Sequence, residues 1–164
     1  MAVTLFLSIL LMAALFLLLY AAVALIQDRR LFTSAPKVIQ AAVQPKPERF
    51  PGQHILGWLL LALAVLCYPA AFVYGAWEGA REGFGFWRFF LRFLLMLLLN
   101  KAFDVLFFDW FLLGHSRFFP RYYPETEKLV GPHHFGYNRK DHLTHVILFV
   151  PACLLLAWLA TVIF

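Results

Sequence analysis

The first apolar stretch of the chain reads AVTLFLSILLMAALFLLLYAAVALI, from Ala2 to Ile26, and it contains no charged residue. An α-helix needs about 20 apolar residues to cross a hydrocarbon core roughly 30 Å thick. Three further runs of that length follow, at residues 55–77, 84–113 and 143–164. The sequence therefore predicts an all-α fold, an integral membrane bundle of four transmembrane helices that forms a single domain over residues 1–164.

The composition of the 164 residues agrees with lipid-facing helices, since 63% are hydrophobic, 14% are charged, and the mean hydropathy is +0.76. These values depart from those of soluble domains in the direction typical of membrane proteins. The formal net charge of +5 does not indicate a nucleic-acid partner, because the basic residues gather in two loops. The partners expected from composition are membrane lipids.

Charge also predicts the orientation of the bundle. The loops at about 27–54 and 114–142 each hold five Lys or Arg residues, whereas the short connection between the second and third runs offers Arg81. Basic residues close to transmembrane segments are retained on the cytoplasmic side. We therefore expect both long loops in the cytoplasm, both termini on the extracytoplasmic side, and a multi-pass protein of the plasma membrane.

Two local patterns predict how helices and loops are connected. Residues 78–83, EGAREG, form a connection so short that the second and third helices must be antiparallel neighbours. In the first long loop, apolar residues recur at helical spacing from Lys37 to Val43. This spacing predicts a short amphipathic helix that lies on the membrane surface.

The third apolar run is unusual because Asn100, Lys101, Asp104 and Asp109 interrupt it. Each charged residue costs about 2.5–3.5 kcal/mol near a bilayer centre when it has no partner. At about 100° per residue, Asn100 and Asp104 fall on one helical stripe with His115, and Asp109 points roughly the opposite way. Lys101 and Asp104 can neutralise each other while Asn100 bonds to a neighbouring helix. Alternatively, the stripe lines a cytoplasm-facing cavity for an ion, a proton or a polar headgroup.

The second long loop, together with the start of the last run, holds most of the histidines. His142 and His145, three residues apart, share a helical face, and His133 and His134 lie upstream. Neutral imidazoles with a carboxylate such as Glu127 suit zinc or iron, so these four histidines are candidate ligands for a divalent metal. The pair at 142 and 145 lacks the glutamate of an H-E-x-x-H motif.

A second interpretation of the same loop is that it meets lipid headgroups. Basic side chains near a membrane interface attract anionic phosphates. The candidates for this contact are Arg117, Arg121, Arg139 and Lys140. Asp109 lies near the same interface, and we expect it to cap its helix or to pair with one of the first two arginines.

One block of sequence resembles a known set of proteins. It consists of Asn100-Lys101-Ala102-Phe103-Asp104, then Phe108-Asp109-Trp110, His115-Ser116, and Pro124-Glu125-Thr126-Glu127. This block, over roughly residues 100 to 150, resembles a set of uncharacterised bacterial four-span integral membrane proteins. The chain departs from their pattern at Glu125, where they have glycine. The resemblance implies a bacterial plasma-membrane protein and no activity, and it draws attention to Asp104, Asp109, His115 and Glu127.

Three functions from different classes remain open. In the first, the chain is a membrane enzyme that binds or modifies a lipid or isoprenoid headgroup at the cytoplasmic face, with Asp104, Asp109, His115 and Glu127 as acid, base or metal ligands. In the second, it is a small transporter or channel subunit that uses Asp104 and Lys101. In the third, it is a non-catalytic partner of another membrane protein. A homodimer is a further expectation, because four helices enclose little volume.

Overall fold

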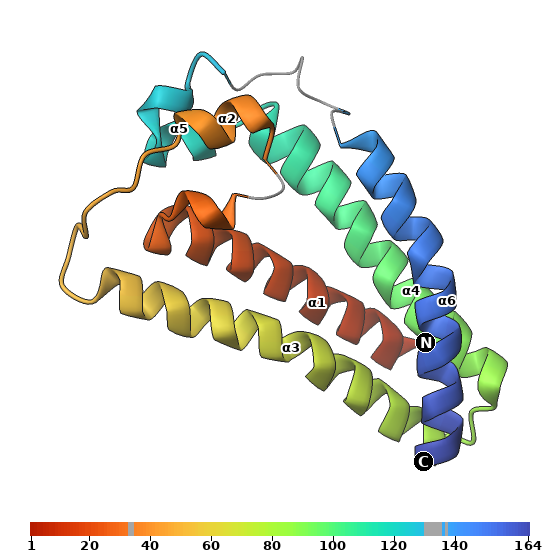
Figure 1. Cartoon of the computed structure of the whole chain (residues 1–164). Coiled ribbons are helices and arrows are strands. Elements are labelled where there is room, and N and C mark those ends of the chain that lie inside the picture. Colours follow the sequence, from red (N-terminus) through yellow and green to blue (C-terminus); the bar gives the residue numbers. More distant parts are fainter. Residues whose placement is uncertain (33–34, 130–135, 137) are drawn as a thin grey trace.

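The computed structural model describes residues 1–32, 35–129, 136 and 138–164, and every regular element in this part of the chain is helical (Figure 1). In chain order the elements are α1 (Ala2–Tyr20), η1 (Ala21–Ile26), η2 (Arg29–Leu31), α2 (Lys37–Ala42), α3 (Gln53–Arg81), α4 (Phe86–Phe103), η3 (Asp104–Leu113), α5 (Phe118–Tyr122), η4 (Pro124–Thr126) and α6 (Arg139–Ile163). The predicted all-α fold is therefore confirmed.

Three helical segments within the described ranges are long and apolar enough to cross a membrane, namely Ala2–Ile26, Gln53–Arg81 and Arg139–Ile163. They coincide with the first, second and fourth apolar runs. The third run forms α4 and continues without a break into η3. The helix α4 is not among the three candidate spans, and it differs from them in composition because it carries three cations, Arg88, Arg92 and Lys101.

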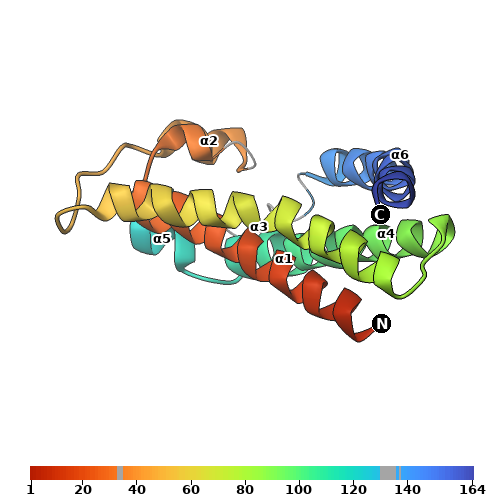
Figure 2. The ribbon, with the colours of Figure 1, turned by 90° about the horizontal axis from the view of Figure 1, so that it is seen from below.

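The long helices are arranged as two pairs, α1 with α3 and α4 with α6, and α1 also packs against α4. The pairs lie close together at the end that carries both termini and spread apart toward the long loops (Figure 1). Seen from below, α2 and α6 lie on the same side of the layer formed by α1, α3 and α4 (Figure 2). The predicted antiparallel hairpin of α3 and α4 is present, although α4 packs mainly against α6 and α1.

Small residues allow the paired helices to approach closely. The buried face of α3 contains Gly57, Ala64, Ala71, Gly75 and Gly79. A Cβ atom at Gly57 would lie 2.9 Å from the Cβ of Leu25 and 2.7 Å from Cγ1 of Ile26. The buried face of α6 is similarly built from Cys153, Ala157 and Ala160. Small residues at helix interfaces are typical of membrane bundles, where tight packing and not the hydrophobic effect holds helices together.

A buried ion pair joins α3 to α4 near their short connection. Arg92 is 4% exposed, donates to the carbonyl of Gly75 over 2.7 Å, and pairs with the carboxylate of Glu78. Its guanidinium also lies 4.2 Å from the ring centre of Phe84. Nothing in the local sequence pattern distinguishes this pair, which compensates one of the charges within α4.

The two long loops fold onto each other and form a second apolar core, centred on Phe32, Ile39, Val43, Phe119 and Tyr123. The predicted amphipathic helix is confirmed as α2, which buries Ile39 completely. Val38 belongs to the same apolar pattern but is 57% exposed, so only part of that pattern is buried, and the position of α2 on a membrane surface stays a prediction. This second core closes the end of the bundle where the helix pairs spread apart.

A polar contact ties the loops together at the surface. The ammonium of Lys46 lies 2.9 Å from the carboxylate of Glu125, which also accepts a hydrogen bond from the backbone N–H of Gln44. Partial burial raises the pKa of Glu125, but the bonds from Lys46 and from backbone N–H groups outweigh it and hold that pKa below its ordinary value. Glu125 therefore has a structural role, because it joins the second long loop to the first.

The contact at Gly57 gives a stability prediction. Gly57→Val should lower the free energy of unfolding by about 1–3 kcal/mol, because its side chain would push α3 away from η1. The matched control is Ala62→Val, at an exposed position of the same helix. Thermal unfolding of the purified protein in detergent measures both. Equal losses in the two variants would contradict the close packing described for η1 and α3.

Candidate functional site

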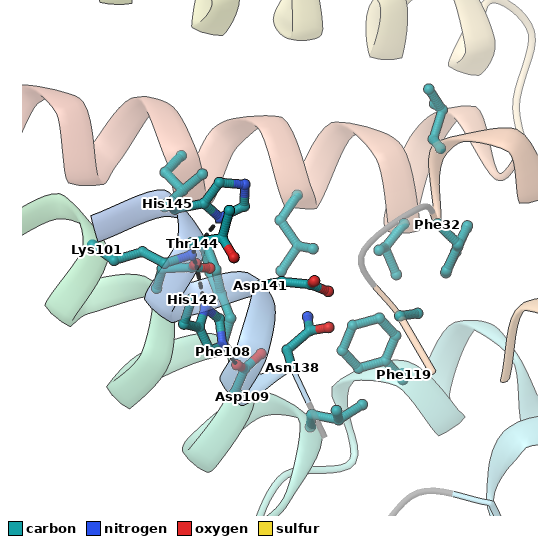
Figure 3. A pocket seen from close by; sticks show the side chains of 17 residues that line it. Phe32, Lys101, Phe108, Asp109, Phe119, Asn138, Asp141, His142, Thr144 and His145 are labelled. Atoms are coloured by element: carbon teal, nitrogen blue, oxygen red, sulfur yellow. Dashed lines mark hydrogen bonds and ion pairs between the residues drawn. The ribbon is translucent and has the colours of Figure 1, made fainter. Parts of the chain in front are cut away.

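A polar cluster joins η3 to α6 at the loop end of the bundle (Figure 3). Nε2 of His142 lies 2.6 Å from Oδ2 of Asp109. The ammonium of Lys101 lies 2.7 Å from Oδ2 of Asp104 and 3.5 Å from Nδ1 of His145. We call these five residues the loop-end cluster. The predicted pair of Lys101 with Asp104 is thus present, and it is linked to both histidines of α6.

The type of helix explains how both aspartates reach the same histidine. The segment η3, from Asp104 to Leu113, is a π-helix. Its hydrogen bonds run between residues five apart, so Asp104 and Asp109 lie on nearly the same face. The prediction that Asp109 points away from Asp104 was wrong because it assumed α-helical geometry throughout. Asp109 bonds to His142 and not to an arginine of the loop.

The second nitrogen of His142 lacks a hydrogen-bond partner among the described residues and is covered by neighbouring atoms. Because an ionised carboxylate only accepts hydrogen bonds, we assign the proton between His142 and Asp109 to Nε2. The Nδ1 atom then carries a lone pair, is buried, and has no hydrogen-bond partner among the described residues. It lies 4.0 Å from Oδ2 of Asp104. A histidine oriented by a carboxylate, with its other nitrogen free, is the arrangement of a general base.

The loop-end cluster forms one wall of a cavity of about 520 Å³. The opposite wall is apolar and comes from α1, η1 and the first long loop, with Leu15, Leu19, Val23, Leu31 and Phe32. The cavity therefore lies between the two helix pairs, where they spread apart, and residues of the folded loops form part of its lining. Its two walls differ in chemistry, which suits a ligand with a polar and an apolar part.

Two of the four candidate catalytic residues lie outside this cavity. The ring of His115 is tilted by 42° against that of Trp110 with 4.7 Å between ring centres, and its Nδ1 is 2.7 Å from the Trp110 carbonyl oxygen. Glu127 is exposed and lies 4.0 Å from the guanidinium of Arg117. Asp104 and Asp109 are brought together, whereas His115 and Glu127 are not part of their cluster. Asn100 donates to the hydroxyl of Tyr68 on α3, as expected for a bond between helices.

The basic residues predicted to bind phosphate also lie outside the cavity lining. Arg117 and Arg121 line a separate pocket of about 460 Å³ with Tyr122. Arg139 lines a groove between α4–η3 and α6, and Lys140 lines none of these sites. The structure therefore separates the cations of the second loop from the acids of the loop-end cluster.

The proposed metal ligands are only partly placed. His133 and His134 lie outside the described residues. His142 and His145 belong to the loop-end cluster, where they contact Asp109 and Lys101. Within the described ranges, no group of three or more His, Cys, Asp or Glu side chains is arranged to hold a metal ion. The ammonium of Lys101 already supplies a positive charge beside Asp104.

Sequence reasoning missed the aromatic part of the cavity wall. Phe32, Phe108 and Phe119 line the cavity, and they come from three separate elements (Figure 3). With 19 phenylalanines in the chain, their residue type gave no signal that could distinguish them from ordinary core residues. The sequence did indicate the polar part of the wall, through the helical face that His142 and His145 share.

The bond between η3 and α6 predicts a measurable coupling. Asp109→Leu and His142→Leu should each destabilise the protein, and the double variant should show a coupling energy of about 1.5–3 kcal/mol, as expected for a hydrogen bond to a charged group. The control is His115→Leu, whose ring contacts the exposed Trp110 and should change stability by no more than about 0.5 kcal/mol. Additive losses at 109 and 142, measured by unfolding in detergent, would refute the pairing.

Comparisons of this chain with known protein families, with curated proteins and with solved structures found no match.

Proposed function

We propose that the chain is a four-span protein of the bacterial plasma membrane that binds the headgroup of an amphiphile, such as a lipid or an isoprenoid, in the loop-end cavity. The long loops then face the cytoplasm and both termini lie outside, as the positions of the basic residues favour. The observation that carries the binding function is the pairing of a polar and an apolar wall around one cavity between the helix pairs.

The charges in α4 are compatible with a fourth span. Arg92 is paired with Glu78, and Lys101 is paired with Asp104. Pairing lowers the cost of placing charged groups inside a membrane, so the composition of α4 overstates the penalty for insertion. In addition, α4 packs along α6, which is itself long and apolar enough to span. These contacts support a third crossing by α4 and η3.

The loop-end cluster gives the cavity a chemical capacity beyond binding. His142, held by Asp109, has a buried Nδ1 atom without a hydrogen-bond partner, and this atom would accept a proton from a hydroxyl group of the ligand once the side chains that cover it move. In an enzyme this step would activate a headgroup oxygen, with His142 as base and Asp109 as the residue that orients it. Lys101 would stabilise negative charge that develops nearby.

One observation favours a second candidate function, a small transporter. Lys101 and His142 line the cavity and also line the groove of about 490 Å³ between α4–η3 and α6, together with Leu143 and Val146. Two ionisable side chains therefore separate an internal cavity from a groove between the helices. Residues in such a position are typical of coupling sites in membrane transport.

The orientation can be tested with single cysteines in a background where Cys67 and Cys153 are replaced by alanine. Glu127→Cys should react with a membrane-impermeant maleimide only after the cytoplasmic side is exposed, whereas Glu82→Cys should react from outside in intact cells. Both residues are exposed in the structure. Labelling of both cysteines from the same side would rule out a crossing by α4 and η3.

Binding can be tested by filling the cavity. Leu19 lines it, so Leu19→Trp should remove an amphiphile that co-purifies with the protein in mild detergent and is detected by native mass spectrometry. The control is Leu5→Trp on the same helix, where the side chain is 48% exposed and does not line the cavity. Absence of a bound amphiphile from the unmodified protein, or its retention in both variants, would contradict the proposed function.

A further inference from the structure

We infer that the cavity selects amphiphiles whose headgroup is a cation, such as an alkylammonium. This inference rests on the proposed function, because it names the class of ligand for the same cavity. It also differs from the expectation of a phosphate headgroup, which the basic residues of the second loop suggested.

The charge of the lining is the first argument. Three carboxylates, Asp104, Asp109 and Asp141, face one ammonium, Lys101, so the formal charge is −2 while His142 and His145 are neutral. The lining residues from α1, η1, η2 and α5 carry no charge. The lining is therefore acidic on one side and apolar on the other, and Asp141 is exposed to solvent.

Part of this charge lies where water is scarce. The side chains of Asp104 and Asp109 are 26% and 13% exposed, and together they exceed the charge of Lys101 by one, whereas Asp141 is exposed to solvent. Interactions between charges strengthen as the effective dielectric constant falls, so this excess favours a cation that enters the cavity.

The aromatic residues of the wall are the second argument. Phe32, Phe108 and Phe119 all line the cavity (Figure 3). Alkylated ammonium groups bind well to surfaces that combine aromatic rings with carboxylates, because each ring attracts a cation placed over its face. An anionic headgroup would gain nothing from these rings and would meet three carboxylates.

The position of the cations is the third argument. Arg117, Arg121 and Lys140 do not line the cavity, and Arg139 lines only the groove outside it. Binding of phosphate in proteins usually relies on arginine or lysine side chains that are free to face the ligand. Lys101, the only cation among the described lining residues, is already paired with Asp104.

The experiment compares two probes with the same alkyl chain, dodecyltrimethylammonium and dodecylphosphate, added to the full-length protein in dodecyl maltoside micelles. Thermal unfolding is measured at pH 8. We expect the cation to raise the unfolding midpoint by several degrees and the anion to have no comparable effect. In Asp109→Asn, the concentration of cation needed for half of the effect should rise about tenfold.

Two further variants make the outcome decisive. Leu19→Trp should abolish protection by the cation, and Glu82→Gln, which removes an exposed acid at the opposite end of α3, should leave it unchanged. Protection by dodecylphosphate that Leu19→Trp abolishes would overturn the inference about charge and leave the proposed function standing. The inference about charge would also be overturned if neither probe protected the protein while an amphiphile still co-purified with it and was lost in Leu19→Trp. Failure of the proposed function itself would appear separately, as the absence of any amphiphile that depends on Leu19.

Discussion

The structure depends on the neutralisation of charge within the helix that runs from α4 into η3. This helix brings Arg92 and Lys101 into a bundle of apolar helices, and each cation is met by a carboxylate, from Glu78 at one end and from Asp104 at the other. Because an unpaired charge in such surroundings costs several kcal/mol, these contacts decide which neighbours the helix can have. The pair at Glu78 holds α3 beside α4, and the cluster around Asp104 extends to α6 through His142.

The cavity follows from the way the four long helices pack. Small residues such as Gly57 and Gly75 on α3, and Ala157 on α6, permit close contact within each half of the bundle. Toward the loops the halves spread apart, and side chains from the loops, among them Phe32 and Phe119, line part of the space between them. The charged lining residues come from α4, η3 and α6, whereas α1 and η1 contribute only apolar ones, which is why one cavity offers both kinds of surface.

Much of the fold could be predicted from the sequence because it follows from local pattern. Apolar runs gave the long helices, helical spacing gave α2, and a separation of three residues gave the pair of Lys101 and Asp104. The bond between Asn100 and Tyr68 was likewise expected as a contact between helices. These features need only the regular geometry of an α-helix and the cost of burying polar groups.

The candidate site was predicted less completely, because it depends on contacts between distant segments and on a change of helix type. Asp109 was predicted on the wrong face, because no pattern in residues 100–110, NKAFDVLFFDW, predicts a π-helix. The ion pair of Glu78 with Arg92 joins residues on two helices and has no signature in the sequence of either one.

The π-helical segment has a structural consequence of its own. If η3 were rewound as an α-helix, residues 104 and 109 would be separated by about 140° around the axis, and only one of them could face His142. The number of carboxylates that this imidazole meets is therefore set by the winding of a single ten-residue segment.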